Sequence, residues 1–199
     1  MEGRTRLRPT TAGIVIAILA VLVLAVDQFT KHLALQNLPY ERAVQVWGDF
    51  LQFYLTRNSG AAFSLGEGVT WVFTIILGVA ALIVVSLAVV RVRGRLWAVV
   101  LGLLLGGILG NLTDRLFREP GFAVGHVVDF IYTPWMMPAI YNVADMFIVT
   151  MMISVALLVL FGFRLDGTRE PRAGAMADGA QNRVSSGETG ASSLGRTDA

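Results

Sequence analysis

The sequence contains no cysteine and only two histidines, His32 and His126, among its 199 residues. Without cysteine the chain has no disulfide framework, no thiolate nucleophile and no metal site with Cys ligands. Two histidines are too few for a histidine-rich zinc site. We therefore expect a function that uses neither a metal nor another cofactor.

Charged residues are also scarce, at 15% of the chain, whereas soluble domains have about 25%. The net charge of +2 is too small to indicate nucleic-acid binding. Hydrophobic residues make up 55% of the chain and lie in long runs separated by short polar segments. A helix needs about 20 apolar residues to span a bilayer. We predict four membrane spans, at about residues 12–35, 69–90, 96–113 and 139–163.

The first run follows Arg4, Arg6 and Arg8, as the apolar part of a secretory signal peptide would. No clean small-x-small cleavage site follows it, because Ala25-Val26-Asp27 leads into a polar segment. Three further apolar runs also favour a protein that crosses the membrane several times. We interpret the first run as a span, with a cleaved signal peptide as the alternative.

Two links between the spans carry strand-forming residues. Residues 43–55 place Val, Phe, Tyr and Leu on both sides of Trp47-Gly48-Asp49, a pattern that predicts a β hairpin. Residues 122–132 are similar and could pair with it. The predicted fold class is therefore a mainly α, polytopic membrane protein with a small extracytoplasmic β element in residues 1–165. Residues 166–199 lack aromatic residues and apolar periodicity, which predicts a disordered cytoplasmic tail.

Basic residues predict the orientation. Eleven of the 16 lysines and arginines lie in the N-terminal segment, in the link at residues 91–95 and in the C-terminal segment from Arg164 onward. Because cytoplasmic loops are enriched in Lys and Arg, we expect both termini in the cytoplasm. The other two links then face the outside.

Five polar clusters lie at the predicted outer ends of the spans, at residues 27–31, 57–63, 106–115, 127–130 and 141–145. Polar residues at such positions indicate function by default. Structural interpretations carry equal weight for two pairs: Asp27 and Lys31 could be an i,i+4 pair that caps a span, and Asp114 with Arg115 could be a solvated helix end. The spacing of the glycines in 106–110 favours close helix packing.

Asp129 and Asp145 are the strongest catalytic candidates, because each acid lies among apolar residues. Pro134 and Pro138 make a continuous helix between them improbable, so the chain can fold back and bring the two carboxyl groups together. Two adjacent carboxyl groups do not both ionise easily. One can act as the base that activates water, while the other stays protonated and polarises a carbonyl.

Taken in order, these motifs resemble the lipoprotein signal peptidase (type II signal peptidase) family. The resemblance rests on Asp27-Gln-x-Thr-Lys31, Asn58-x-Gly-Ala-Ala-Phe63, Gly106-Gly-x-x-Gly-Asn-x-x-Asp-Arg115, Val-Val-Asp129-Phe and Asn142-x-Ala-Asp145. It covers about residues 12–163, and five motifs in register are highly specific. One departure is Tyr141, where the family usually has Phe.

The resemblance implies an intramembrane aspartic endopeptidase of the bacterial cytoplasmic membrane, with its active site at the outer face. Such an enzyme removes the signal peptide of prolipoproteins by cleaving before a diacylglyceryl-modified cysteine. The implied partners are these prolipoproteins and membrane lipids, with cyclic depsipeptide inhibitors at the active site and no nucleic acid; we expect a monomer. The implied site residues are Asp129 and Asp145 as the catalytic pair, Asn58, Gly60, Asn111, Arg115 and Asn142 as substrate-binding or site-ordering residues, and Asp27, Lys31 and Asp114 as supports.

The alternative function is a small four-span, proton-coupled transporter or channel that uses Asp27, Asp114, Asp129 and Asp145 as a relay. Transporter sites typically lie near the bilayer midplane between internal repeats. In this sequence the acids lie toward one surface and no repeat is present. A non-catalytic scaffold would not need two acids in separate apolar contexts. The sequence therefore favours the peptidase.

Overall fold

The structure is a computed structural model that describes residues 6–60 and 69–169. Most of the predicted tail, from residue 170 onward, lies outside the described residues, as do positions 61–63 of the second motif.

Four helices form a bundle: α1 (Pro9–Asn37), α2 (Thr70–Val90), α3 (Arg95–Phe117) and α4 (Val143–Leu160). Within the described ranges, these four helices are long and apolar enough to cross a membrane. Pro9 suits the first turn of α1, where its missing N–H is not needed, and Pro39 prevents the helix from continuing past Leu38. The predicted fold of four membrane-spanning helices is confirmed.

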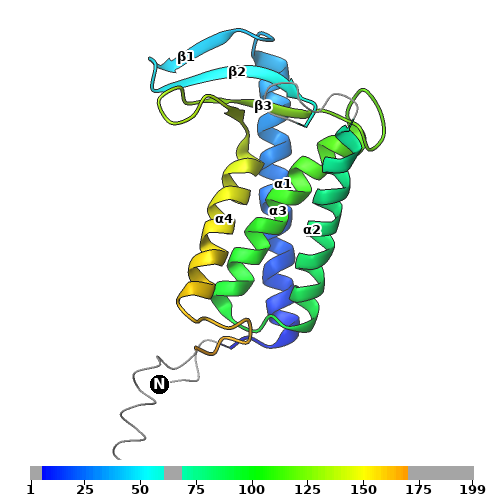
Figure 1. The fold of residues 1–199 in the computed structure, drawn as a ribbon, viewed down its shortest axis with the longest axis vertical. Coiled ribbons are helices and arrows are strands. Elements are labelled where there is room, and N and C mark those ends of the chain that lie inside the picture. The colour runs from blue at the N-terminus through cyan, green and yellow to red at the C-terminus, as the bar shows by residue number, and fades with distance from the viewer. Residues whose placement is uncertain (1–5, 61–68, 170–199) are drawn as a thin grey trace, which may run out of the picture.

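Helix α3 lies at the centre of the bundle, between α4 and α2, with α1 packed against it (Figure 1). Its glycines allow this close packing. A Cβ atom added to Gly106 would lie 2.6 Å from Cβ of Val23 and 2.8 Å from the backbone oxygen of Ala20. Large apolar side chains of the other three helices are exposed, as expected for surfaces that contact lipid tails.

An antiparallel sheet crosses one end of the bundle (Figure 1). Its strands are β1 (Ala43–Trp47), β2 (Leu51–Asn58), β3 (Val127–Tyr132) and β4 (Ile140–Tyr141), in the order β1-β2-β3-β4. The predicted hairpin and its pairing with the later segment are confirmed, although that strand begins only at Val127. Residue Thr56 of β2 pairs with Asp129 of β3.

The fourth apolar run begins at Ala139, but the helix begins four residues later, at Val143. Ile140 and Tyr141 instead pair with β3, and Asn142 caps the helix by accepting a hydrogen bond from the backbone N–H of Asp145. Asp145 therefore lies in the first turn of α4, not six residues inside a span.

At the opposite end, three segments that are distant in sequence are joined by backbone hydrogen bonds. The N–H of Leu7 donates to the oxygen of Arg93 over 2.6 Å, and the N–H of Arg93 donates to the oxygen of Leu165 over 2.9 Å. The first and last described residues thus lie at the same end of the bundle (Figure 1).

A first prediction tests the contact between α1 and α3. We expect Gly106→Leu to lower the free energy of unfolding by about 1–3 kcal/mol, because the new side chain must displace α1. Thermal unfolding in detergent micelles measures the effect. The matched control is Gly78→Leu in α2, where an added Cβ meets nothing within 4 Å. Equal stability of the two variants would contradict close packing at Gly106.

Candidate active site

The polar clusters found in the sequence meet beneath the sheet. They come from the last turns of α1, the end of β2, the last turns of α3, strand β3 and the first turn of α4. The fold thus brings together segments that are more than a hundred residues apart, such as Asp27 and Ala144, which share a hydrogen bond.

Lys31 is fully buried at the centre of this region. Its Nζ lies 2.8 Å from Asp27 Oδ2, 2.8 Å from Asp114 Oδ2 and 2.9 Å from Asn111 Oδ1. The side chains of Lys31, Asp27 and Asp114 are all 0% exposed. The predicted i,i+4 pair of Asp27 and Lys31 is present, but it is fully buried and shared with Asp114, so it is more than a cap of one helix. The interpretation of Asp114 and Arg115 as a solvated helix end is wrong, because both residues are buried.

The two acids that contact Lys31 also hold neighbouring elements in place. Asp27 Oδ1 accepts a hydrogen bond from the N–H of Ala144 over 2.9 Å, which ties α1 to the start of α4. Asp114 Oδ2 accepts from the N–H of Val128 over 3.1 Å, which ties α3 to β3. The elements that carry Asp145 and Asp129 are thus positioned by one buried charge cluster.

Two members of this cluster were not among the predicted site residues. Gln28 Nε2 donates to Asp27 Oδ2 over 3.1 Å and to Asp114 Oδ1 over 3.0 Å. Arg118 Nε donates to Asp114 Oδ1 over 2.6 Å. Gln28 lies within the first motif, and Arg118 follows Asp114 by four residues, so i,i+4 spacing was the available signal for Arg118.

Asp129, on β3, is 2% exposed and accepts two amide hydrogen bonds. Asn58 Nδ2 donates to its Oδ2 over 2.9 Å, and Asn142 Nδ2 donates to its Oδ1 over 2.6 Å. Asn58 is itself held by the N–H of Gly60, which donates to Asn58 Oδ1 over 2.9 Å. Gly60 has φ +133°, a backbone conformation that side chains strongly disfavour, so this turn requires glycine.

Asp145 is held by the other end of the same amide network. Asn111 Nδ2 donates to Asp145 Oδ1 over 2.7 Å, and the N–H of Asn142 donates to Oδ2 over 3.1 Å. Together with the bond from the Asp145 N–H to Asn142 Oδ1, this forms a capping box at the start of α4.

Two of these asparagines connect the acids: Asn142 bonds to both, and Asn111 bonds to Asp145 and to Asn142. Asn58 bonds to Asp129 alone. Asn142 Nδ2 also donates to Asn111 Oδ1 over 3.1 Å, and that oxygen accepts from Lys31. Amides fix both carboxyl groups without adding a positive charge beside them. Burial and the charge of Asp145 together raise the pKa of Asp129 to about 7. Such a coupled pair of acids can hold one proton between them near neutral pH.

Arg115 is buried beside this network but, among the described residues, it forms no ion pair with Asp129 or Asp145. One guanidinium nitrogen donates to the oxygen of Gly125 over 3.1 Å, and the guanidinium lies 5.7 Å from the ring centre of Phe73. Its Nε has no hydrogen-bond partner in the part of the chain that the structure describes.

No three His, Asp or Glu side chains of residues 6–60 and 69–169 converge as metal ligands would. Chemistry by carboxyl groups without a metal stays a prediction.

Comparison with known proteins supplies the family. The family model for signal peptidase (SPase) II matches residues 19–163. The chain belongs to the signal peptidase II family. Its relatives include the lipoprotein signal peptidases of Leifsonia xyli subsp. xyli, 49% identical over 82% of this chain and 75% of the relative, and of Rhodococcus jostii, 45% identical over 77% and 76%.

The fold agrees with this assignment. A bacterial membrane enzyme solved by the in meso method at 1.9 Å resolution is similar, with a TM-score of 0.66 and 27% identity over 79% of this chain and 97% of that chain. The predicted protease is confirmed by its membership of the signal peptidase II family, as is a multi-pass bacterial membrane protein. The alternative of a proton-coupled transporter or channel finds no support.

A second prediction concerns Lys31. We expect Lys31→Met to lower the free energy of unfolding by about 3–5 kcal/mol, because Asp27 would be left as a buried acid without a cation and Asp114 would keep only Arg118. Thermal unfolding in detergent micelles measures this. Arg42→Met, an exposed site before β1, is the control and should change little. If both variants unfold alike, Lys31 does not hold the cluster together.

Proposed function

We propose that this chain removes the signal peptide of bacterial prolipoproteins by hydrolysing the peptide bond just before a diacylglyceryl-modified cysteine, with Asp129 and Asp145 as the catalytic acids. The observation that carries the proposal is a pair of carboxyl groups, the buried Asp129 and the half-buried Asp145, joined by Asn111 and Asn142 at the sheet end of four apolar helices. The bond to be cleaved lies between a membrane-embedded signal peptide and a lipid-anchored cysteine. It therefore lies near the membrane surface, at the level of the helix ends that carry the two acids.

Asp145 is the general base in this proposal. It lies in the first turn of α4, where the helix dipole and the N–H of Asn142 stabilise a carboxylate. The carboxylate accepts a proton from a water molecule as the water oxygen attacks the carbonyl carbon of the scissile bond.

Asp129 is the general acid. With its pKa raised to about 7, it keeps a proton at neutral pH and donates a hydrogen bond to the carbonyl oxygen. It then supplies a proton to the leaving amine, and the C–N bond breaks. The proton taken up by Asp145 restores the single proton shared by the pair.

The remaining predicted residues have positioning roles. Asn58, Asn111 and Asn142 fix the orientation of both carboxyl groups, and Gly60 holds the Asn58 side chain in place. The cluster of Lys31, Asp27 and Asp114 fixes β3 and α4, which carry the acids. We assign Arg115 to the substrate backbone, because its Nε is available within the buried site.

The proposed orientation places the sheet and the acids at the outer face of the cytoplasmic membrane. Arg6, Arg93 and Arg164 lie at the end away from the sheet, and the excess of basic residues there favours the cytoplasm. We also propose that the enzyme works as a monomer, because both acids and their amide partners come from one chain, and that cyclic depsipeptide inhibitors bind at the acids.

The test of this function uses purified full-length protein with a lipid-modified and an unmodified prolipoprotein. We expect cleavage of the modified precursor alone, immediately before the lipidated cysteine. Asp129→Asn and Asp145→Asn should each lower the rate at least about a hundredfold, because each removes a proton-transfer group. Mass spectrometry of the products measures both the cleavage position and the rate.

The matched control is Asp49→Asn, which changes an exposed acid in the turn between β1 and β2. This variant should cleave the precursor at the rate of the unmodified enzyme. Thermal unfolding should be preserved in all three variants. Near-full activity of either the Asp129 or the Asp145 variant would refute the assignment of the pair.

The pH dependence distinguishes the two roles. The pKa of Asp129 is raised, so its protonated form persists up to about pH 7 and is lost above it. If Asp129 is the acid, kcat should fall as pH rises through about 7. A kcat that instead rises through this pH would make Asp129 the base and reverse the assignment.

A further inference from the structure

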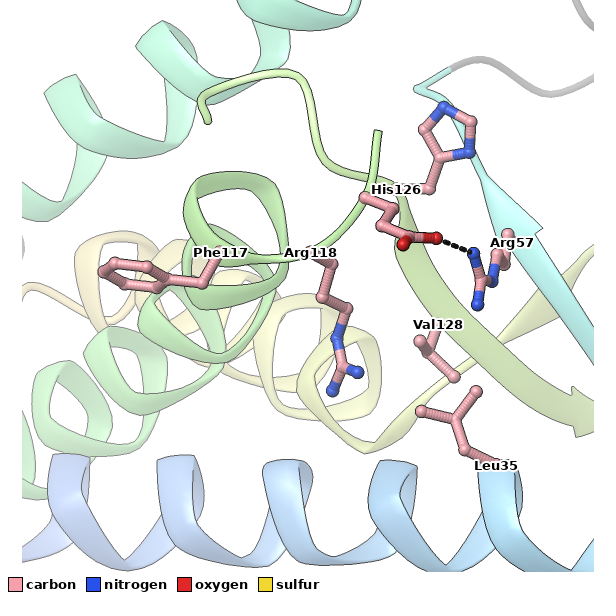
Figure 2. Close-up of a pocket in the computed structure, with 7 residues that line it drawn as sticks. Leu35, Arg57, Phe117, Arg118, His126 and Val128 are labelled. Atoms are coloured by element: carbon pink, nitrogen blue, oxygen red, sulfur yellow. Dashed lines mark hydrogen bonds and ion pairs between the residues drawn. The ribbon is translucent and has the colours of Figure 1, made fainter. Parts of the chain in front are cut away.

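A polar cavity lies on the face of β3 opposite Asp129. Its volume is about 250 Å³, and it is lined by Leu35, Arg57, Phe117, Arg118, Glu119, His126 and Val128. Figure 2 shows Arg118 and Arg57 on opposite sides of the hollow, with Val128 and Leu35 toward one end and His126 toward the other. Neighbouring residues of a strand point to opposite faces, so Val128 faces this cavity while Asp129 faces the amide network.

The rim of the cavity carries one positive and one negative group that hold each other only weakly. Arg57 and Glu119 are 3.3 Å apart, and their side chains are 45% and 83% exposed. An exposed ion pair contributes little to stability, so both groups can take new partners at small cost. Arg118 differs, because its guanidinium is already bound to Asp114 and Gln28.

The floor of the cavity is apolar and lies at the ends of two membrane helices. Leu35 belongs to the last turn of α1, Val128 is 1% exposed, and Phe117 is the last residue of α3 and is 76% exposed. A charged rim above an apolar floor, at the end of the spans, matches the boundary between lipid headgroups and acyl chains.

We propose that this cavity binds the headgroup of a phospholipid that carries a primary ammonium, such as phosphatidylethanolamine. The phosphate accepts hydrogen bonds from the Arg57 guanidinium, and the ammonium donates to the Glu119 carboxylate. The cavity is smaller than sites that enclose drug-sized ligands, which span about 300–1,000 Å³, so the acyl chains stay in the bilayer beside Leu35 and Phe117.

The two charges select among phospholipids. An anionic lipid such as phosphatidylglycerol would place its phosphate beside Glu119 without an ammonium to compensate. A choline headgroup has no N–H to donate to that carboxylate. Only a headgroup with both a phosphate and a primary ammonium satisfies Arg57 and Glu119 together.

Binding in this cavity would affect the position of Asp129 through strands β2 and β3. Arg57 directly precedes Asn58, which donates to Asp129, and Val128 directly precedes Asp129 itself. A bound headgroup therefore contacts both strands that position Asp129 and should raise the cleavage rate. This consequence rests on the proposed function, whereas the binding itself does not.

The experiment measures lipid retention by the purified full-length protein with native mass spectrometry. The probes are phosphatidylethanolamine, phosphatidylglycerol and phosphatidylcholine with identical acyl chains, each present at the same concentration. We expect phosphatidylethanolamine to be retained about tenfold more strongly, as expected for one extra charged hydrogen bond. Arg57→Gln should remove this retention, and Glu119→Gln should remove the preference over phosphatidylglycerol.

The matched controls are Arg42→Gln and Glu41→Gln, two exposed charges before β1 that do not line the cavity. Both should keep the preference of the unmodified chain. Equal retention of the three lipids, or an unchanged preference in Arg57→Gln, would overturn the proposal. Competition by water-soluble glycerophosphoethanolamine with the affinity of the lipid would also overturn it, because the ligand would then be the free headgroup.

Cleavage assays in bilayers with and without phosphatidylethanolamine separate this inference from the proposed function. Selective binding with an unchanged cleavage rate would refute the coupling to Asp129. If the protein binds the lipid selectively but cleaves no prolipoprotein under any condition, the proposed function is refuted and the lipid site is still supported.

Discussion

The buried ammonium of Lys31 is the interaction on which the rest of this structure depends. It lies among Asp27, Asp114 and Asn111, at 2.8–2.9 Å from each. A buried charge is tolerated only when it is paired and hydrogen-bonded. Here each acid that neutralises Lys31 also accepts a backbone N–H, from Ala144 or from Val128. The electrostatic requirement of one lysine therefore fixes the helix and the strand that carry the two catalytic candidates.

This cluster can form only because helices α1, α3 and α4 approach each other very closely. A Cβ on Gly110 would lie 2.6 Å from Asp27 Oδ2, and one on Gly107 would lie 2.8 Å from the oxygen of Ala144. The glycines of α3 thus permit the charge cluster as well as the helix packing. They leave room for the Asp27 carboxylate and for the start of α4 beside the same helix. A methyl group added at Gly110 would collide with the Asp27 carboxylate that pairs with Lys31.

Much of this arrangement could be predicted from the sequence, and the remainder depended on three-dimensional neighbours. Long apolar runs predict spans, and isolated acids within them predict a site, because both patterns are local. The start of α4 could not be read in this way, because Ile140 and Tyr141 are as apolar as a helix would need and pair with β3 instead. The half-buried Arg118 contacts Gln28 of another helix as well as Asp114, and the sequence showed only the weak i,i+4 spacing from Asp114.

Strand β3 gives the protein two chemically different faces at the same depth. Asp129 faces a network of neutral amides that also binds Asp145, while Val128 faces a cavity edged by Arg57 and Glu119. Val128 and Asp129 are neighbours on one backbone, so we infer that a ligand that shifts Val128 on one face also shifts Asp129 on the other. Under the proposed roles, the position of Asp129, the acid that holds a proton near neutral pH, therefore depends on what occupies the cavity on the far side of β3.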